Sequence, residues 1–273
     1  MEPGIPCHRC NQCRSGAYHL CRGGMIFAAT PPWDGTLAKY HVNASDFCYK
    51  VPDHMSMEEA AMVEPVSVAV AIAKTADPRA HQTVLVLGCG PIGVLCQAMA
   101  KAAGAKTVIG VDVVQSRLAV AESYGVDHVF MPERPAPDDD PMAQAEKMAV
   151  KLKEECGLDE GTDVVLECSG AEACVQMGIF AARHGGTIVQ AGIGKETVNF
   201  PIAAVCTRGL ALKGSIRYLT GCYPAAIDLI GKGIIDVKRL VTNRFEFEEV
   251  EQAFESAKSG RQDVFKVMIA GAV

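Results

Sequence analysis

The chain has 273 residues, of which 49% are hydrophobic and 21% are charged, and its formal net charge is −6. These values fit a globular protein of one large or two ordinary domains, and the acidic balance without a Lys/Arg-rich run disfavours a nucleic-acid partner. No apolar run approaches the roughly 20 residues that span a bilayer, and MEPGIPCHRC lacks the regions of a signal peptide, so we expect a soluble cytoplasmic protein without a membrane partner.

Four of the twelve cysteines, Cys7, Cys10, Cys13 and Cys21, follow the spacing Cys-x2-Cys-x2-Cys-x7-Cys. Such short spacers let four thiolates converge tetrahedrally on one zinc ion. Four thiolates close the coordination shell, so this zinc would be structural and not catalytic. Two disulfides or uncommitted thiols are the alternatives. The other eight cysteines are scattered singly among apolar segments, as expected for reduced core thiols.

Residues 1 to about 75 are rich in turn formers and end in an apolar helical stretch, MEEAAMVEPVSVAVAIAKTA. They predict a small β-rich lobe that leads into a helix. From residue 82 onward, apolar strands alternate with amphipathic helices, which predicts a parallel, doubly wound sheet. The strands are QTVLVLG, KTVIGVD, HVFM, TDVVLEC, GTIVQAG and LALKGSI, and the helices span 91–103, 115–124, 142–156 and 171–183.

The segment PERPAPDDDP at 132–141 is predicted to be a solvated loop. The last sixty residues predict two helices, at 222–233 and 248–259, around a short strand, followed by a closing strand, VFKVMIAG.

The first strand of the predicted sheet runs into GCGPIG, which places Gly88, Gly90 and Gly93 at the spacing Gly-x-Gly-x-x-Gly. In a dinucleotide site the first glycine permits a tight turn, the second lets the backbone approach the pyrophosphate, and the third lets the helix pack against the strand. Pro91 and Ile92 open that helix and belong to the predicted cofactor site. A glycine-rich turn without a ligand is the alternative.

The second strand ends in Asp112, a little over twenty residues after the first glycine. A carboxylate there can accept hydrogen bonds from the adenosine ribose and would repel a 2′-phosphate, which favours NAD over NADP. Arg117 follows and could either stack on adenine, as we expect, or bind a 2′-phosphate. Without a ligand, Asp112 would serve as a helix N-cap.

The chain resembles the zinc-containing medium-chain alcohol dehydrogenases, and within them the polyol (sorbitol and xylitol) dehydrogenases, with the fungal xylitol dehydrogenases nearest. The resemblance covers the whole chain and rests on the cysteine motif and on FAATPPWDGTLAKYHV, DFCYKVP, MVEPVSVAV, GCGPIG, GVDVVQSRL, LECSG and KGSIRY. It implies an α/β fold in which a doubly wound Rossmann sheet accompanies an incomplete β-rich, GroES-like catalytic domain.

The resemblance also implies a division of the chain. Residues 1–75 would form part of the catalytic domain with the structural-zinc lobe, residues 76–215 the NAD-binding domain, and residues 216–273 a return to the catalytic domain. Members of this family commonly form dimers or tetramers through the nucleotide-binding domain, so a homo-oligomer is expected.

Individual residues take roles from the same resemblance. Glu64 matches an acidic residue beside or on the catalytic zinc, although by itself it also fits a helix cap or an ion pair. Arg217 and Tyr218 match the pair that contacts the hydroxyls of a polyol substrate, and their alternative is a surface pair on an edge strand. Gly170 and Gly192 match positions that pass close to the nicotinamide.

One feature of the family has no counterpart in this sequence. Its catalytic zinc is held by a cysteine and a Gly-His-Glu motif upstream of the structural-zinc lobe, and no Gly-His-Glu occurs here. In the intact mechanism, that zinc binds the substrate hydroxyl and stabilises the alkoxide from which hydride passes to NAD, yielding a ketose.

Two explanations fit the missing motif. The chain is a truncated NAD-dependent polyol dehydrogenase, or it is a non-catalytic NAD-binding or subunit-interaction protein. We expect the first, because missing strands leave unpaired edges that natural proteins avoid.

Overall fold

A computed structural model describes residues 1–23, 26–27 and 35–272. Residues 28–34, part of the segment FAATPPWDGTLAKYHV, lie outside the described residues. The chain divides into two compact units: Met1–Val68 with Arg217–Val273, and Ala69–Ile216. None of the helices formed by the described residues has the length and apolar character to cross a membrane.

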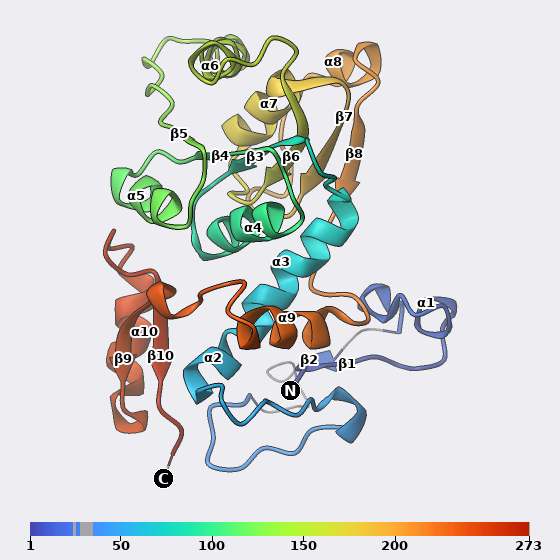
Figure 1. The fold of residues 1–273 in the computed structure, drawn as a ribbon, viewed down its shortest axis with the longest axis vertical. Coiled ribbons are helices and arrows are strands. Elements are labelled where there is room, and N and C mark those ends of the chain that lie inside the picture. Colours follow the sequence, from blue (N-terminus) through green and yellow to red (C-terminus); the bar gives the residue numbers. More distant parts are fainter. Residues whose placement is uncertain (24–25, 28–34, 273) are drawn as a thin grey trace. The chain divides into compact units, whose positions relative to one another are not determined.

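The unit Ala69–Ile216 is built around a six-stranded parallel sheet of order β5-β4-β3-β6-β7-β8 (Figure 1). The strands are β3 (Thr83–Leu87), β4 (Thr107–Val111), β5 (His128–Phe130), β6 (Thr162–Glu167), β7 (Ala182–Gln190) and β8 (Ala211–Gly214). The helices are α4 (Pro91–Ala102), α5 (Gln115–Ser123), α6 (Pro141–Glu155), α7 (Glu172–Ala181) and α8 (Ile202–Thr207). The predicted doubly wound sheet is confirmed. The short helix α8 was not predicted.

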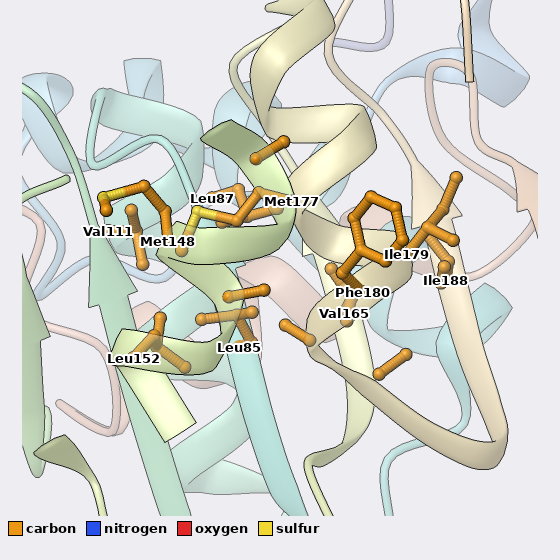
Figure 2. Close-up of a cluster of buried hydrophobic side chains, with 14 of the residues drawn as sticks. Leu85, Leu87, Val111, Met148, Leu152, Val165, Met177, Ile179, Phe180 and Ile188 are labelled. Carbon is orange, nitrogen blue, oxygen red and sulfur yellow. The ribbon is translucent and has the colours of Figure 1, made fainter. Parts of the chain in front are cut away.

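The core of this unit explains why the strand β3 is apolar without interruption. Successive side chains of a strand point to opposite faces, so a strand covered on both faces buries all of them. Leu85 and Leu87 belong to the cluster formed with α6 and α7 (Figure 2). Val86 faces the other way and lies close to Gly93 of α4. From Val84 to Leu87 the side chains of β3 are fully buried.

The strand order reverses at β3. The chain runs outward through β4 to β5 and then returns to place β6 on the other side of β3. In open α/β sheets, ligands bind outside the carboxyl ends of the strands at such a switch point. The turns after β3, β4, β6 and β7 are therefore the segments in which this unit places a candidate site.

The other unit contains two small sheets within the described residues. Strand β1 (Gly4–Ile5) pairs antiparallel with β2 (Ile26–Phe27), and β9 (Val241–Phe245) pairs parallel with β10 (Lys266–Ile269). Its helices include α1 (Asn11–Arg14), α9 (Cys222–Gly231) and α10 (Val250–Lys258). The two predicted C-terminal helices and the strands around them are therefore present.

The stretch 57–76, predicted as one helix, forms two: α2 (Met57–Ala61) and α3 (Val63–Ala76). Ser56 caps α2 through a reciprocal pair of hydrogen bonds with Glu59. Pro65 explains the break. Its ring removes the N–H that would bond to the carbonyl of Ala61 and crowds that carbonyl, whereas in the first turn of a new helix the missing donor costs nothing.

Candidate cofactor, metal and substrate sites

Cys7, Cys10, Cys13 and Cys21 come together around the short helix α1. Their Sγ atoms all lie within 4.8 Å of one another, with Cys10 and Cys13 at 3.4 Å and Cys7 and Cys13 at 3.9 Å. A tetrahedral zinc with Zn–S bonds of about 2.3 Å needs sulfurs roughly 3.8 Å apart. The four thiols therefore fit zinc. Elsewhere in the described residues, no group of three or more His, Cys, Asp or Glu side chains is gathered in this way.

Backbone N–H groups help to ionise this cluster. The N–H of Cys7 donates to Cys21 Sγ at 3.3 Å, and that of Cys10 donates to Cys7 Sγ at 3.4 Å. A hydrogen bond from the backbone of Cys13 lowers the pKa of the Cys10 thiol to about 6, whereas burial raises the pKa of Cys13 to about 12. A bound divalent cation deprotonates its thiol ligands outright, so metal binding would remove this difference.

The glycine-rich turn joins β3 to α4 with the geometry that a dinucleotide site requires. Gly88 has φ +93°, a backbone conformation that residues with a side chain rarely adopt. A Cβ on Gly93 would lie 1.8 Å from the carbonyl oxygen of Gly88, so the helix can approach the turn only at a glycine. A Cβ on Gly90 would meet nothing within 4 Å. Gly90 is the N-cap of α4, Pro91 its first residue and Ile92 its second.

Asp112 directly follows β4, and its carboxylate hydrogen-bonds to the glycine-rich turn. Its Oδ2 accepts a hydrogen bond from Cys89 N at 2.8 Å, and its Oδ1 accepts one from Val114 N at 2.9 Å. Asp112 is 7% exposed, and Arg117 Nη1 lies 3.8 Å from Oδ2. Each carboxylate oxygen keeps a further lone pair for a ligand. The structure therefore brings the glycine-rich turn, Asp112 and Arg117 together.

Gly170 and Gly192 lie in the turns after β6 and β7, and these two turns pack backbone against backbone. A Cβ on Gly192 would lie 2.1 Å from Gly170 N, and a Cβ on Gly194 would lie 1.9 Å from Gly170 O. The side chain of Glu167 lies between the turns and was not singled out from the sequence. The available signal was the position of an acidic residue at the end of an apolar strand, TDVVLE.

Glu64 lies in the first turn of α3 and lines a cavity of about 350 Å³ in the unit Met1–Val68 with Arg217–Val273. The residue is exposed overall, but partial burial of its carboxyl group raises the pKa of Glu64, and the positive charge of Lys266 opposes this rise. The other residues that line the cavity are Met1, Pro3, Thr36, Tyr49, Val51, Ala60, Ala61, Val63, Tyr223 and Ile227.

Tyr218 and Arg217 do not line this cavity. Tyr218 is 2% exposed, and its ring packs edge-on against that of Tyr223 with centroids 5.0 Å apart. Burial lowers the pKa of Arg217, and the residue adopts φ 57°, which is uncommon for a residue other than glycine. Tyr218 therefore contacts the cavity wall through Tyr223, which lines the cavity.

Two aromatic residues that the sequence analysis did not name form part of the cavity wall. The rings of Tyr49 and Tyr223 stack with centroids 5.4 Å apart. Tyr49 is held by its hydroxyl, which donates to Glu2 Oε2 at 3.1 Å, and Tyr18 donates to Glu2 Oε1 at 2.5 Å. No sequence pattern signals this pair, because its members come from segments far apart along the chain.

Both the sequence and the fold of the chain match those of known proteins. A family model described as zinc-binding dehydrogenase matches residues 91–232. The chain is 47% identical over 271 residues to the probable D-xylulose reductase A of Arthroderma otae, covering 99% of the chain and 73% of that relative.

Two solved structures from Escherichia coli have the same fold. One is an oxidoreductase/dehydrogenase of unknown specificity, at 30% identity and a TM-score of 0.87, covering 100% of this chain and 75% of that one. The other is L-idonate 5-dehydrogenase, at 26% identity and a TM-score of 0.84, covering 98% and 74%.

Proposed function

Because the chain belongs to the zinc-binding dehydrogenases, we propose that it serves the NAD-dependent oxidation of a polyol secondary alcohol, of the xylitol or sorbitol type, to a ketose. The carbinol carbon loses a hydride to the nicotinamide and the hydroxyl loses a proton, so that alcohol and NAD⁺ give ketone, NADH and H⁺. The names of a D-xylulose reductase and an L-idonate 5-dehydrogenase among its relatives support a substrate that carries several hydroxyl groups.

The observation that carries the proposal is the glycine-rich turn joined to Asp112. Bound NAD⁺ would supply the hydride acceptor. The open space beside Gly90 would admit the pyrophosphate to the N-terminus of α4, at Pro91 and Ile92. Asp112 would accept hydrogen bonds from the adenosine ribose, and Arg117 would lie against the adenine.

Further residues would contact the nicotinamide and the polyol substrate. Gly170 and Gly192 would pass along the nicotinamide. On the substrate side, Glu64 would accept a hydrogen bond from a polyol hydroxyl. Arg217 and Tyr218 would recognise neighbouring hydroxyls, and Tyr223, which packs against Tyr218, would form part of the wall around the substrate.

The two zinc sites known in the family differ in how well this chain fits them. Cys7, Cys10, Cys13 and Cys21 would hold a zinc that braces their loop. We also propose a cytoplasmic location, because such a site needs its cysteines reduced. Glu64 belongs to no group of three metal-binding side chains within the described residues, so a catalytic zinc does not fit there.

The same observation favours a second candidate function. A chain that holds a structural zinc and NAD, but has no metal centre at the substrate cavity in its described residues, would act as a non-catalytic NAD-binding or subunit-interaction protein.

A combined measurement on the purified chain separates these functions. Zinc would be quantified by elemental analysis, NADH binding by its fluorescence, and oxidation of xylitol and sorbitol by NADH formation with and without added zinc. About one zinc per chain, NADH binding and turnover support the dehydrogenase. NADH binding without turnover supports the second candidate. A chain that holds zinc but does not bind NADH contradicts both.

A further inference from the structure

Glu167, the last residue of β6, carries a carboxylate that is removed from solvent. The residue is 0% exposed. Within the described part of the chain, Glu167 takes part in no ion pair, so hydrogen-bond donors compensate its charge instead of a cation. Burial of an ionised group is costly unless donors surround it. The arrangement of these donors indicates what the carboxylate holds in place.

The first group of donors belongs to the turn that follows β6. Oε1 accepts hydrogen bonds from Ser169 N at 2.9 Å, from Ser169 Oγ and from Gly170 N at 3.0 Å. Oε2 also lies 3.0 Å from Gly170 N. The Ser169 hydroxyl in turn accepts a hydrogen bond from Ala171 N at 3.0 Å. The carboxylate thus fixes the path of residues 169–171.

The second group of contacts joins this turn to the one after β7. Gln190 Nε2 donates to Glu167 Oε2 at 2.6 Å and to the carbonyl of Gly192 at 2.8 Å. The backbone carbonyl of Glu167 accepts from Ala191 N at 2.9 Å and from Gly192 N at 2.7 Å. Glu167 therefore joins the turns after β6 and β7 to each other through both its side chain and its backbone.

The residues that Glu167 holds also contact the glycine-rich turn. A Cβ on Gly88 would lie 3.0 Å from Ser169 Cβ and 3.1 Å from Ser169 N, so Gly88 packs directly on the residue that Glu167 holds. A Cβ on Gly192 would lie 2.6 Å from Glu167 Oε2. Three turns at the carboxyl ends of β3, β6 and β7 thus meet at one buried carboxylate.

We infer that Glu167, with Gln190 as its partner, is a positioning residue that sets the spacing of the turns 167–170 and 190–194 and thereby shapes the place of the nicotinamide half of the cofactor. The inference rests on the proposed function, which assigns Gly170 and Gly192 to the nicotinamide. Glu167 acts through these turns and not by contact with the cofactor.

The chemistry of the donors requires a carboxylate at this position. Every group that hydrogen-bonds to the side chain of Glu167 is an N–H or O–H donor. In Glu167→Gln the new amide would place its own donors against at least one of them and leave that donor unpaired in a buried site. In Gln190→Met a side chain of similar length remains, but the bridge between the two turns is lost.

The test compares two ligands that differ in the nicotinamide. Wild-type chain, Glu167→Gln and Gln190→Met would be titrated with NADH by fluorescence and with ADP-ribose by calorimetry. ADP-ribose keeps the adenosine, pyrophosphate and second ribose. We expect each variant to raise the Kd for NADH about tenfold, the effect of a lost buried hydrogen bond, and to change the Kd for ADP-ribose by less than about twofold. The glycine-rich turn keeps its own hydrogen bonds, from Gly88 N to Val111 O and from Cys89 N to Asp112 Oδ2, which do not involve Glu167.

Glu133→Gln is the matched control, since it makes the same chemical change in the same unit at an exposed carboxylate paired with Lys147 and Lys151. It should leave both affinities unchanged. Equal losses for NADH and ADP-ribose would show a merely structural role, and unchanged NADH affinity would show none, so either result overturns the inference. If Glu167→Gln does not fold, Gln190→Met decides between these outcomes.

Failure of the proposed function is distinguishable in the same experiment. A wild-type chain that binds neither ligand contradicts NAD binding itself, and the inference with it. A wild-type chain that binds both, with variants that bind NADH normally, overturns the role of Glu167 alone.

Discussion

At the scale of single residues, Asp112 has two tasks that one substitution would disturb together. It holds the backbone N–H of Cys89 in the glycine-rich turn, and in the proposed function it also reads the adenosine ribose. The first task affects any dinucleotide equally, whereas only the second distinguishes NAD from NADP. The ratio of the two affinities is therefore the informative quantity.

We predict that Asp112→Ala weakens the binding of NADH much more than that of NADPH. The substitution removes a hydrogen-bond acceptor for the ribose hydroxyls and at the same time relieves repulsion of a 2′-phosphate, which together change the ratio by about tenfold or more. Fluorescence titration with both cofactors measures it. Asp112→Asn, which keeps one acceptor oxygen for Cys89 N, serves as the control for the turn. Equal losses for the two cofactors would contradict the ribose assignment.

At the scale of an element, the glycine-rich turn contains one glycine that the fold requires and another that the fold does not require. A Cβ at Gly93 would collide with the Gly88 carbonyl at 1.8 Å, whereas a Cβ at Gly90 would enter open space. One glycine is thus required by the packing of the protein itself. The other has no packing reason in the free protein, and in the proposed function it lets a ligand approach the backbone.

This difference predicts that a glycine-to-alanine substitution lowers mainly the stability at one of these positions and mainly the affinity for NADH at the other. Gly93→Ala should lower the free energy of unfolding by about 3 kcal/mol, because a backbone clash outweighs the gain of about 1 kcal/mol in helix propensity. Gly90→Ala should cost at most about 1 kcal/mol, since alanine is a poorer N-cap, yet raise the Kd for NADH about tenfold or more by blocking the pyrophosphate.

Urea denaturation and NADH fluorescence on both variants measure the two effects. Normal NADH binding by Gly90→Ala would remove the argument that the open space beside Gly90 belongs to a pyrophosphate.

The segment that carries Cys7, Cys10, Cys13 and Cys21 has little regular structure, since α1 contains four residues and β1 two. Its conformation therefore depends on a few side chains. Metal binding contributes directly to folding in such segments. The loop around the four cysteines should therefore lose its order together with the metal.

We predict that Cys13→Ser lowers the zinc content from about one per chain to none, because the serine oxygen does not replace a thiolate at a zinc site with Zn–S bonds of about 2.3 Å. Cys48→Ser is the matched control, since Cys48 is exposed and its thiol donates to Ala44 O, a bond that a serine hydroxyl retains. Elemental analysis and limited proteolysis would report both variants. Full zinc retention in Cys13→Ser would contradict the four-thiolate site.

At the scale of the whole molecule, the exposed edge of the six-stranded sheet bears on assembly. Strand β8 ends the sheet, and all four of its residues are exposed. Leu212 on this strand and Ile216 just after it are each 45% exposed. An exposed edge strand with apolar side chains is a template for pairing with another chain.

We predict a homo-oligomer that forms across this edge. Light scattering after size-exclusion chromatography should give a mass of at least twice the 29.0 kDa of one chain. Leu212→Lys should shift the protein toward the monomer, because a charge on an edge strand opposes pairing. Val150→Lys, at another exposed apolar side chain of the same unit, should not. A wild-type monomer would contradict the prediction.

The sheet and its helices were predictable because they rest on local periodicity. In β3, β4 and β6, β-branched runs end at the predicted turns, and α4 to α7 begin within a residue of their predicted starts. The break between α2 and α3 was missed, because the apolar pattern continues across Pro65 and hides the effect of the proline on the backbone. Helix α8 has too few residues to establish a periodic pattern.

The sequence alone determined the features that are encoded within short stretches: the parallel sheet, the glycine-rich turn with Asp112, and the four cysteines whose spacing lets them converge. Each depends on residues that are neighbours along the chain or lie at the ends of adjacent strands. The tertiary structure decided which distant side chains meet. Gln190 hydrogen-bonds to Glu167, and the ring of Tyr49 stacks on that of Tyr223. Such contacts between separate elements are set by how the elements pack, and they leave no repeating pattern in the sequence.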